Sequence, residues 1–185
     1  HPHSREEMAE TVVMYDLAVI GAGSAGLSVA AAAAQFGERV VLFEKGDMGG
    51  DCLNSGCIPS KALLAAAKYA DAHRKSAKFG TESHEPDIDF AGAMAHVESV
   101  IKSIAPHDSQ ERFEGLGVTV IRATAKFTGP RTLEASGQSF EARRIIIASG
   151  SRASIPPIPG LAETAHFTNE TIFRNRTKPD HLIII

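Results

Sequence analysis

The segment YDLAVIGAGSAG, residues 15–26, decides the fold class of this chain. It begins with a short apolar run that ends at Gly21, and the Ala-rich stretch 27–36 that follows contains strong helix formers and no proline. A second apolar run, RVVLF at 39–43, is typical of a buried strand and is closed by Glu44. Strand, glycine turn, helix and strand within about 30 residues have the size of one βαβ unit. The sequence therefore predicts an α/β fold with a parallel sheet flanked by helices.

The glycine turn predicts a Rossmann-like nucleotide site. Gly21, Gly23 and Gly26 match the pattern G-x-G-x-x-G between a predicted strand and a predicted helix. Glycines there let the backbone approach a pyrophosphate at the N-terminus of a helix, where free N–H groups favour anions. Glu44, at the end of the second strand, can accept a hydrogen bond from a ribose 2′-hydroxyl. The expected ligand is an adenine dinucleotide, either FAD or NAD; the alternative is a glycine turn needed only for packing.

The two cysteines, Cys52 and Cys57, lie five positions apart in and beside a polar loop at 46–56. A helix rises about 7.5 Å over five residues, which is beyond the reach of an unstrained disulfide. We therefore expect Cys52 to lie outside regular helix, and Gly56 to let the chain bend so that the sulfurs meet. A helix is predicted over 60–78, and its N-terminus would stabilise a Cys57 thiolate. Such a pair suits thiol–disulfide exchange.

Other roles for the cysteines are less consistent with the sequence. A zinc site lacks further ligands, because there is no third cysteine and no histidine at ligand spacing, so no metal is expected. A polar loop is a poor place to bury inert thiols. A purely structural disulfide would be unusual in an intracellular protein.

The stretch GGDCLNSGCIPSK, residues 49–61, closely resembles the active-site motif of the class I pyridine nucleotide-disulfide oxidoreductases. This family includes dihydrolipoamide dehydrogenase, glutathione reductase and mercuric reductase. The glycine fingerprint upstream, and IIASGS at 146–151, fall where the family has its other FAD contacts. The resemblance extends from Tyr15 to the end of the chain and corresponds to the N-terminal, FAD-binding part of such an enzyme.

The resemblance implies that the dinucleotide is FAD and assigns roles to three side chains. Cys57 would face the isoalloxazine as the charge-transfer thiolate, Cys52 would attack a substrate disulfide, and Lys61 would lie near the flavin N5. Ala125 is a candidate backbone contact to the adenine, and Ala148 to Gly150 stand where the family has Ala-Thr-Gly. The residues expected to contact the cofactor are Gly21, Gly23, Ser24, Ala25, Gly26, Glu44, Lys45, Gly50, Asp51, Cys57, Lys61, Ala125, Ala148, Ser149 and Gly150.

Two features depart from the family pattern. Asp51 stands where the family usually has threonine, and its carboxylate is expected to bond N–H groups of the loop or to pair with a lysine such as Lys45. An Asp here looks most like a mercuric-reductase-like subgroup. The family's NAD(P)H-binding domain, and its C-terminal interface domain with a His-Glu acid–base pair, are expected outside this chain.

The expected activity of the full-length enzyme is electron transfer from NAD(P)H through FAD to the Cys52–Cys57 disulfide. The electrons would pass on to a small-molecule or protein-bound disulfide such as lipoamide, and the enzyme would be a homodimer. This fragment alone is expected not to turn over. The alternatives are a mercuric-reductase-like enzyme that reduces a metal ion, and a non-catalytic FAD- or NAD-binding module whose thiols sense redox state.

The remaining sequence suggests boundaries. Residues 1–14 are expected to be a disordered or non-native extension, 15–150 the FAD-binding domain, 151–180 a proline-containing connector, and 181–185 the first strand of a truncated NAD(P)H-binding domain. A small additional β element is expected between 118 and 140. Apolar residues at helical spacing predict a helix whose buried stripe is Phe90, Met94, Val97, Ile101 and Ile104.

Composition limits the function classes. The 185 residues carry a formal net charge of −3, which gives no basic surface for nucleic acid or an acidic membrane. No apolar stretch approaches the roughly 20 residues of a spanning helix, and the start of the chain lacks the apolar centre of a signal peptide. A cytoplasmic protein is therefore expected. His73, His84, His96, His107 and His166 belong to no catalytic motif and are expected on the solvated surface.

Overall fold

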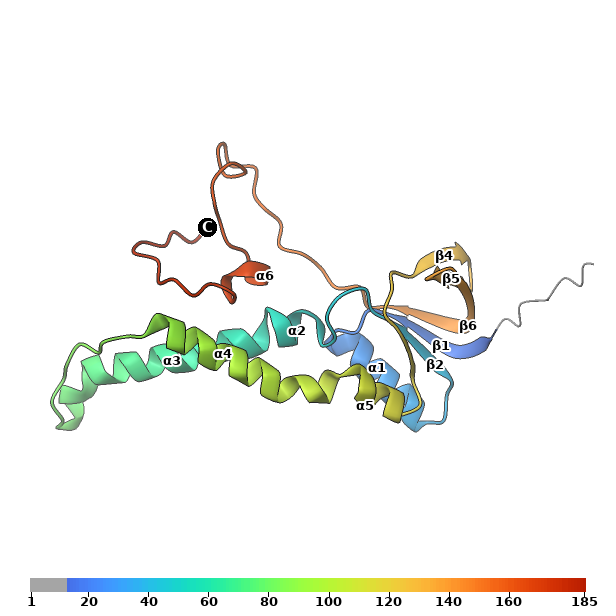
Figure 1. Cartoon of the computed structure of the whole chain (residues 1–185), viewed down its shortest axis with the longest axis horizontal. Helices are drawn as coiled ribbons and strands as arrows, with labels where there is room; N and C mark the ends of the chain where they lie inside the picture. Colours follow the sequence, from blue (N-terminus) through green and yellow to red (C-terminus); the bar gives the residue numbers. More distant parts are fainter. Residues whose placement is uncertain (1–12) are drawn as a thin grey trace, which may run out of the picture. The chain divides into compact units, whose positions relative to one another are not determined.

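A computed structural model describes residues 13–185 (Figure 1). The expected N-terminal extension falls outside these residues except for its last two positions, and Met14 already belongs to the first strand. The chain forms two compact units: a sheet unit made of the residues up to Gly46 and of 113–148, and a helical unit made of 47–112 and 149–185.

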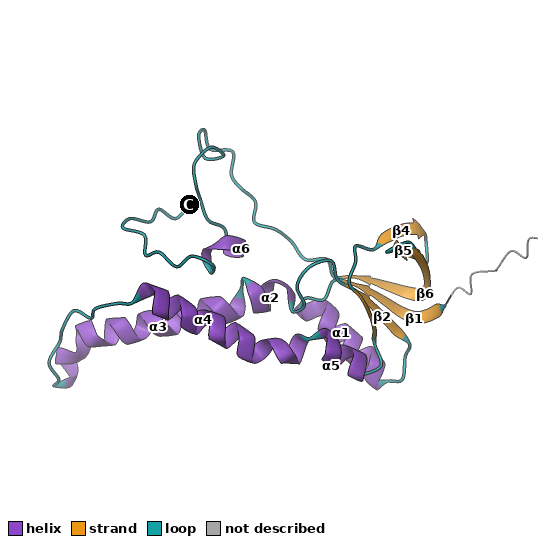
Figure 2. Cartoon of the chain, viewed as in Figure 1, coloured by secondary structure: helices purple, strands orange, loops and turns teal. Residues whose placement is uncertain are grey.

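The sheet unit contains six strands in the order β3-β2-β1-β6-β5-β4 (Figure 2). The strands are β1 (Met14–Ile20), β2 (Val40–Phe43), β3 (Thr119–Ile121), β4 (Lys126–Gly129), β5 (Thr132–Ala135) and β6 (Gln138–Ile147). β1 pairs in parallel with β2 and β6, and β2 with β3, whereas β5 runs antiparallel to β6 and β4. Helix α1 (Ser24–Gln35) connects β1 to β2. The α/β class and the opening βαβ unit are confirmed.

The additional β element is present, but it continues the main sheet. The core on one side of the sheet is apolar and joins the parallel and antiparallel strands. It is formed by Tyr15, Ala18, Val41, Phe43, Leu133, Ala135, Phe140 and Ala142.

The helical unit is built around two long helices that pack on each other. Its elements are α2 (Gly50–Asn54), α3 (Cys57–Lys75), η1 (Ser76–Phe79), α4 (Phe90–Ile104), η2 (Ala105–Asp108) and α6 (Asn169–Ile172), while α5 (Gln110–Gly115) crosses the unit boundary. Met94 and Val97 of α4 are buried together with Ala62 of α3, and Phe90 and Ile101 pack against them. The stripe residues Phe90, Met94, Val97 and Ile101 therefore belong to this core or pack against it, and α4 ends just before Pro106.

Three local expectations were wrong. The loop predicted at 46–56 contains the helix α2. The sequence of the helix predicted over 60–78 puts Tyr69 on the same apolar side as Ala62, yet Tyr69 is 76% exposed. Residues 181–185 form no strand, and Leu182 to Ile185 are exposed; a strand without a neighbour cannot satisfy its backbone hydrogen bonds. The NAD(P)H-binding domain that was expected to start there stays a prediction.

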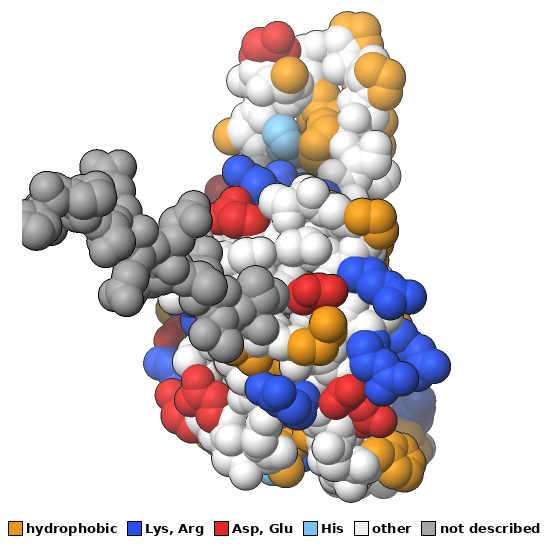
Figure 3. Space-filling view, turned by 90° about the vertical axis from the view of Figure 1, so that its right-hand side faces the viewer, with side chains coloured by type: hydrophobic (Ala, Val, Ile, Leu, Met, Phe, Trp, Pro, Cys, Tyr) orange, Lys and Arg blue, Asp and Glu red, His pale blue; other side chains and the backbone are white. Residues whose placement is uncertain are grey.

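The surface of the described part carries charges of both signs. Acidic and basic side chains are intermixed on the face drawn in Figure 3. Across residues 13–185 no helix is both long enough and apolar enough to span a bilayer.

Candidate functional site

In the sheet unit, the candidate site is the turn between β1 and α1. Gly21 has a φ of 106°, and its N–H donates to the carbonyl of Phe43 at 2.8 Å. Gly23 is the N-cap of α1, and no side chain accepts a hydrogen bond from the N–H groups of the first turn. These groups and the positive end of the helix dipole are therefore suited to an anionic ligand group.

Gly26 shows why this turn requires glycine. A Cβ atom at this position would lie 1.8 Å from the backbone oxygen of Gly21. Because that oxygen belongs to the main chain, no rotamer change could relieve the clash. The close approach of α1 to the turn thus depends on Gly26, as the fingerprint predicts.

The carboxylate of Glu44 holds the same turn through hydrogen bonds to backbone N–H groups. One carboxylate oxygen accepts a hydrogen bond from the N–H of Ala22 at 2.7 Å, and the other accepts one from Gly46 at 2.7 Å. The backbone carbonyl of Gly46 is in turn held by the guanidinium of Arg122. The sequence did not predict this bracing role. A carboxylate has about four acceptor positions, so Glu44 keeps acceptor capacity for a ligand hydroxyl.

The other residues predicted in the sheet unit lie around its strand ends. Ala148 follows β6, and its N–H donates to Ile20 at the end of β1 at 2.8 Å. Ala125 packs against the sheet core immediately before β4. Three further predicted cofactor contacts of this unit, Ser24, Ala25 and Lys45, are exposed. In the helical unit, Ser149 and Gly150 directly follow Ala148 and are exposed, with Gly150 at a φ of 73°.

A separate candidate site, in the helical unit, is the break between α2 and α3. Cys52 lies within α2 and Cys57 is the first residue of α3. Our expectation that Cys52 lies outside helix was therefore wrong. The argument from helical rise holds for one continuous helix, but here Ser55 and Gly56 separate two helices. Gly56 does supply the bend, because a Cβ atom there would lie 2.9 Å from the backbone oxygen of Asp51.

The break brings the two thiols together. Both cysteines are free; Cys52 is half-buried and Cys57 is exposed. The pKa of Cys52 is raised above its ordinary value, first because its thiol is hydrogen-bonded to Cys57 and then because it is partly buried. The positive charge of Lys61, one turn further along α3, acts in the opposite direction on the pKa of Cys52. The structure thus joins the three residues predicted to be catalytic.

Asp51 has partners that the sequence did not reveal. One of its carboxylate oxygens accepts hydrogen bonds from the hydroxyl of Ser55 at 2.7 Å and from the amide of Asn169 at 2.8 Å. These side chains take the place of the loop N–H groups and of Lys45, which were the expected partners. Asn169 lies 118 positions away in the sequence, so no local signal could have identified it.

Histidines play no part in this arrangement. The five named histidines are exposed, as predicted, and the rings of His73 and His84 contact each other with centroids 4.7 Å apart. In residues 13–185 no three His, Cys, Asp or Glu side chains gather in a way that could hold a metal ion.

Comparisons with known proteins show which family the chain belongs to. The family model of the pyridine nucleotide-disulphide oxidoreductases matches residues 15–185. The chain is 30% identical over 171 residues to mercuric reductase of Lysinibacillus sphaericus, covering 92% of this chain and 31% of that protein. It is 31% identical over 176 residues to dihydrolipoyl dehydrogenase of Acholeplasma laidlawii, covering 92% and 52%.

A solved structure agrees with the sequence comparisons. The Cu(II) complex of the HOCl-induced flavoprotein disulfide reductase RclA of Escherichia coli aligns with a TM-score of 0.66 and 27% identity, over 80% of this chain and 31% of that chain. This chain belongs to the pyridine nucleotide-disulphide oxidoreductase family. It spans about one third to one half of the length of these relatives.

Proposed function

We propose that this chain is the FAD-binding and dithiol-bearing part of an NAD(P)H-dependent flavoprotein that reduces a disulfide. The observation that carries the proposal is the placement of Cys52 in α2 and of Cys57 at the first position of α3, on the two sides of one short break, where Cys57 raises the pKa of Cys52. The family relationship supports a reductase, and the relative named dihydrolipoyl dehydrogenase makes lipoamide a reasonable first substrate. A cytoplasmic homodimer is part of the same proposal.

The chain's own residues fit FAD. The uncapped first turn of α1 would bind the pyrophosphate, and Glu44 would accept a hydrogen bond from the ribose. A side chain larger than hydrogen at Gly26 would close the turn. The flavin, when bound, would take a hydride equivalent from NAD(P)H and supply electrons to the Cys52–Cys57 disulfide.

The dithiol would then reduce its substrate in two exchange steps. The Cys52 thiolate attacks one sulfur of the substrate disulfide, forms a mixed disulfide and releases one substrate thiol. Cys57 then attacks the sulfur of Cys52, closes the Cys52–Cys57 disulfide and releases the second substrate thiol. The net reaction converts one dithiol and one substrate disulfide into one protein disulfide and two substrate thiols.

Lys61 would favour the first step. Its positive charge lowers the free energy of a thiolate at Cys52, which is otherwise disfavoured by the neighbouring Cys57 and by burial. We expect Lys61→Met to slow the attack on substrate and Lys61→Arg to retain most of the rate.

A visible spectrum of the purified chain tests the proposal. It is recorded before and after anaerobic addition of about two electrons per flavin. A flavin spectrum that gains a long-wavelength band in the wild type, and not in Cys57→Ser, is the expected result. A protein that binds FAD without gaining this band would contradict contact between the dithiol and the flavin.

A metal ion is the second candidate for the terminal acceptor, because several of the relatives are named mercuric reductase. NADPH oxidation by the full-length protein, measured with Hg²⁺ and with lipoamide in parallel, separates the two candidates. A rate that depends on Hg²⁺ and not on lipoamide would favour the metal ion.

A further inference from the structure

Asp51 fixes the break that separates the two cysteines. Its backbone oxygen accepts a hydrogen bond from the N–H of Ser55 at 2.8 Å, and its carboxylate accepts another from the Ser55 hydroxyl. The second carboxylate oxygen would lie 3.0 Å from a Cβ atom at Gly56. Asp51 therefore packs against both residues of the break. A movement of its carboxylate would allow the direction of α3 relative to α2 to change.

The other donor to this carboxylate is Asn169, which is held in a well-defined turn. The side chain of Thr168 accepts a hydrogen bond from the N–H of Glu170 at 3.3 Å, and the N–H of Thr168 donates to the hydroxyl of Thr171 at 3.0 Å. This reciprocal capping box fixes the start of α6. The amide of Asn169 is thus presented to Asp51 by local backbone structure.

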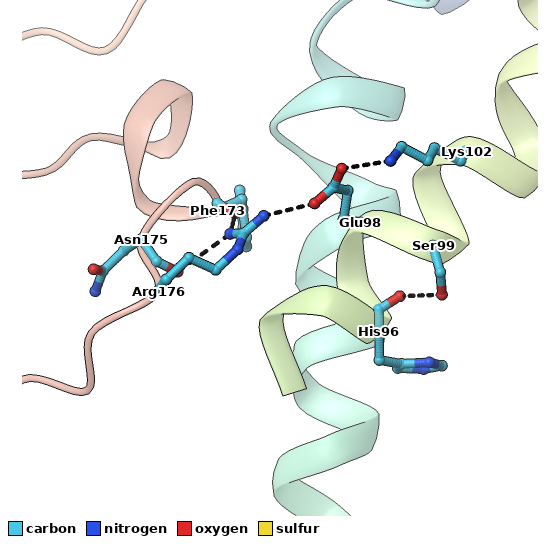
Figure 4. A network of polar contacts seen from close by, with 7 residues as sticks. All are labelled: His96, Glu98, Ser99, Lys102, Phe173, Asn175 and Arg176. Carbon is cyan, nitrogen blue, oxygen red and sulfur yellow. Dashed lines mark hydrogen bonds and ion pairs between the residues drawn. The ribbon is translucent and has the colours of Figure 1, made fainter. Parts of the chain in front are cut away.

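The segment 168–177, here called the strap, is also anchored further along. Phe173 packs against the apolar cluster of Ala62, Met94 and Val97. The guanidinium of Arg176 donates to the carboxylate of Glu98 at 2.8 Å, as Figure 4 shows. Because these contacts already order the strap, the Asn169–Asp51 hydrogen bond costs little additional conformational entropy.

We propose that Asn169 is a positioning residue for the dithiol: through Asp51 it holds the α2–α3 break in the conformation that keeps the two sulfurs in contact. This inference rests on the proposed thiol–disulfide function and adds a residue to it. A disulfide restrains the break covalently, whereas the reduced pair is restrained only by packing and hydrogen bonds. Loss of the Asn169 contact therefore gives more conformational freedom to the dithiol than to the disulfide, and makes disulfide formation less favourable.

Equilibration with glutathione measures this effect directly. The dithiol and glutathione disulfide react to form the Cys52–Cys57 disulfide and two molecules of glutathione, so two protein thiols are oxidised as one glutathione disulfide is reduced. The purified protein, without NAD(P)H, is equilibrated at several glutathione ratios, alkylated and analysed by mass spectrometry. We expect Asn169→Ala to lower the equilibrium constant about threefold to tenfold, the range for the loss of one hydrogen bond.

Two further variants distinguish a specific effect of Asn169 on the dithiol from a general loss of order in the strap. Asn175→Ala removes a side chain of the same type from the same strap, where it exchanges hydrogen bonds with the backbone of Thr177. This variant should leave the constant unchanged. The double variant Asp51→Asn/Asn169→Asp swaps the two side chains, so that an amide donor and a carboxylate acceptor still face each other. It should restore most of the wild-type constant.

The outcomes distinguish this inference from the proposed function. A wild-type protein that forms no Cys52–Cys57 disulfide at any glutathione ratio would overturn both. A wild-type protein that forms it, with Asn169→Ala within twofold of the same constant, would overturn the positioning role alone. An equal loss in Asn175→Ala would also overturn it, because the effect would then come from the strap as a whole.

Discussion

At the scale of single residues, the neighbouring side chains control the pKa of the Cys52 thiol. The raised pKa of Cys52 has Cys57 as its first cause. We therefore expect Cys57→Ala to move the alkylation of Cys52 by iodoacetamide to lower pH, while Lys61→Met should move it to higher pH. Rates measured as a function of pH check both directions. Profiles that shift the same way in both variants would contradict this account.

The same raised pKa has a consequence for stability. The fold favours the protonated form of Cys52, so its contribution is complete below the ordinary thiol pKa and is lost as the pH rises through the raised pKa. Urea unfolding of the reduced protein should show a smaller fall in stability on the alkaline side in Cys57→Ala than in the wild type. The quantity compared is the change in the free energy of unfolding from neutral to alkaline pH within each protein, so that any pH-independent effect of the substitution cancels.

Gly26 allows a second test at this scale. A Cβ atom on Gly26 meets a backbone oxygen, whereas one on Gly115 of α5 meets nothing within 4 Å. We expect Gly26→Ala to lower the free energy of unfolding by about 1 to 3 kcal/mol and to weaken FAD binding. Gly115→Ala should change stability by less than about 0.5 kcal/mol. Chemical denaturation and flavin titration measure the two effects, and equal behaviour of the two variants would refute the steric argument.

At the scale of elements, the packing of α3 on α4 depends on a small apolar cluster. Met94 belongs to this cluster and is 1% exposed, whereas Leu64 on α3 is 67% exposed. Met94→Ala should cost about 2 to 5 kcal/mol, because it removes buried surface and leaves a cavity. Leu64→Ala should cost less than about 0.5 kcal/mol. Urea unfolding of both variants checks the difference, and a Leu64→Ala cost as large as that of Met94→Ala would contradict it.

Elements with a clear apolar pattern were predictable from sequence, and helix α2 was not. The stripe from Phe90 to Ile104 repeats at helical spacing, and the run before Gly21 is a short apolar run that ends at a glycine, so α4 and β1 could be recognised. Helix α2 has poor helix formers at Gly50, Asp51 and Asn54. Leu53 is the residue of this helix that is buried. Its formation depends on tertiary packing, which a local pattern does not contain.

At the scale of the whole molecule, sequence motifs predicted candidate site residues but not the contacts that hold those residues in place. The cysteine motif and the glycine fingerprint identified residues that the structure places at strand and helix ends. The bond between Asp51 and Asn169 joins positions 118 apart, and the brace from Glu44 to Ala22 and Gly46 depends on how β2 meets the turn. Contacts of this kind follow from the topology, which sets the distance between residues that are remote in sequence.

The chain covers only part of the length of its relatives, and this leads to a prediction about catalytic turnover with NAD(P)H. It covers 31% of the mercuric reductase and 52% of the dihydrolipoyl dehydrogenase with which it was compared. We propose that the nicotinamide site and the acid–base pair lie in the remaining length. The 185-residue chain should then exchange its dithiol with an added disulfide once per molecule, yet sustain no NAD(P)H oxidation. Absorbance of NADH and thiol release, followed together, measure both quantities. Repeated turnover with NADH by this chain would show that the nicotinamide site lies within residues 1–185.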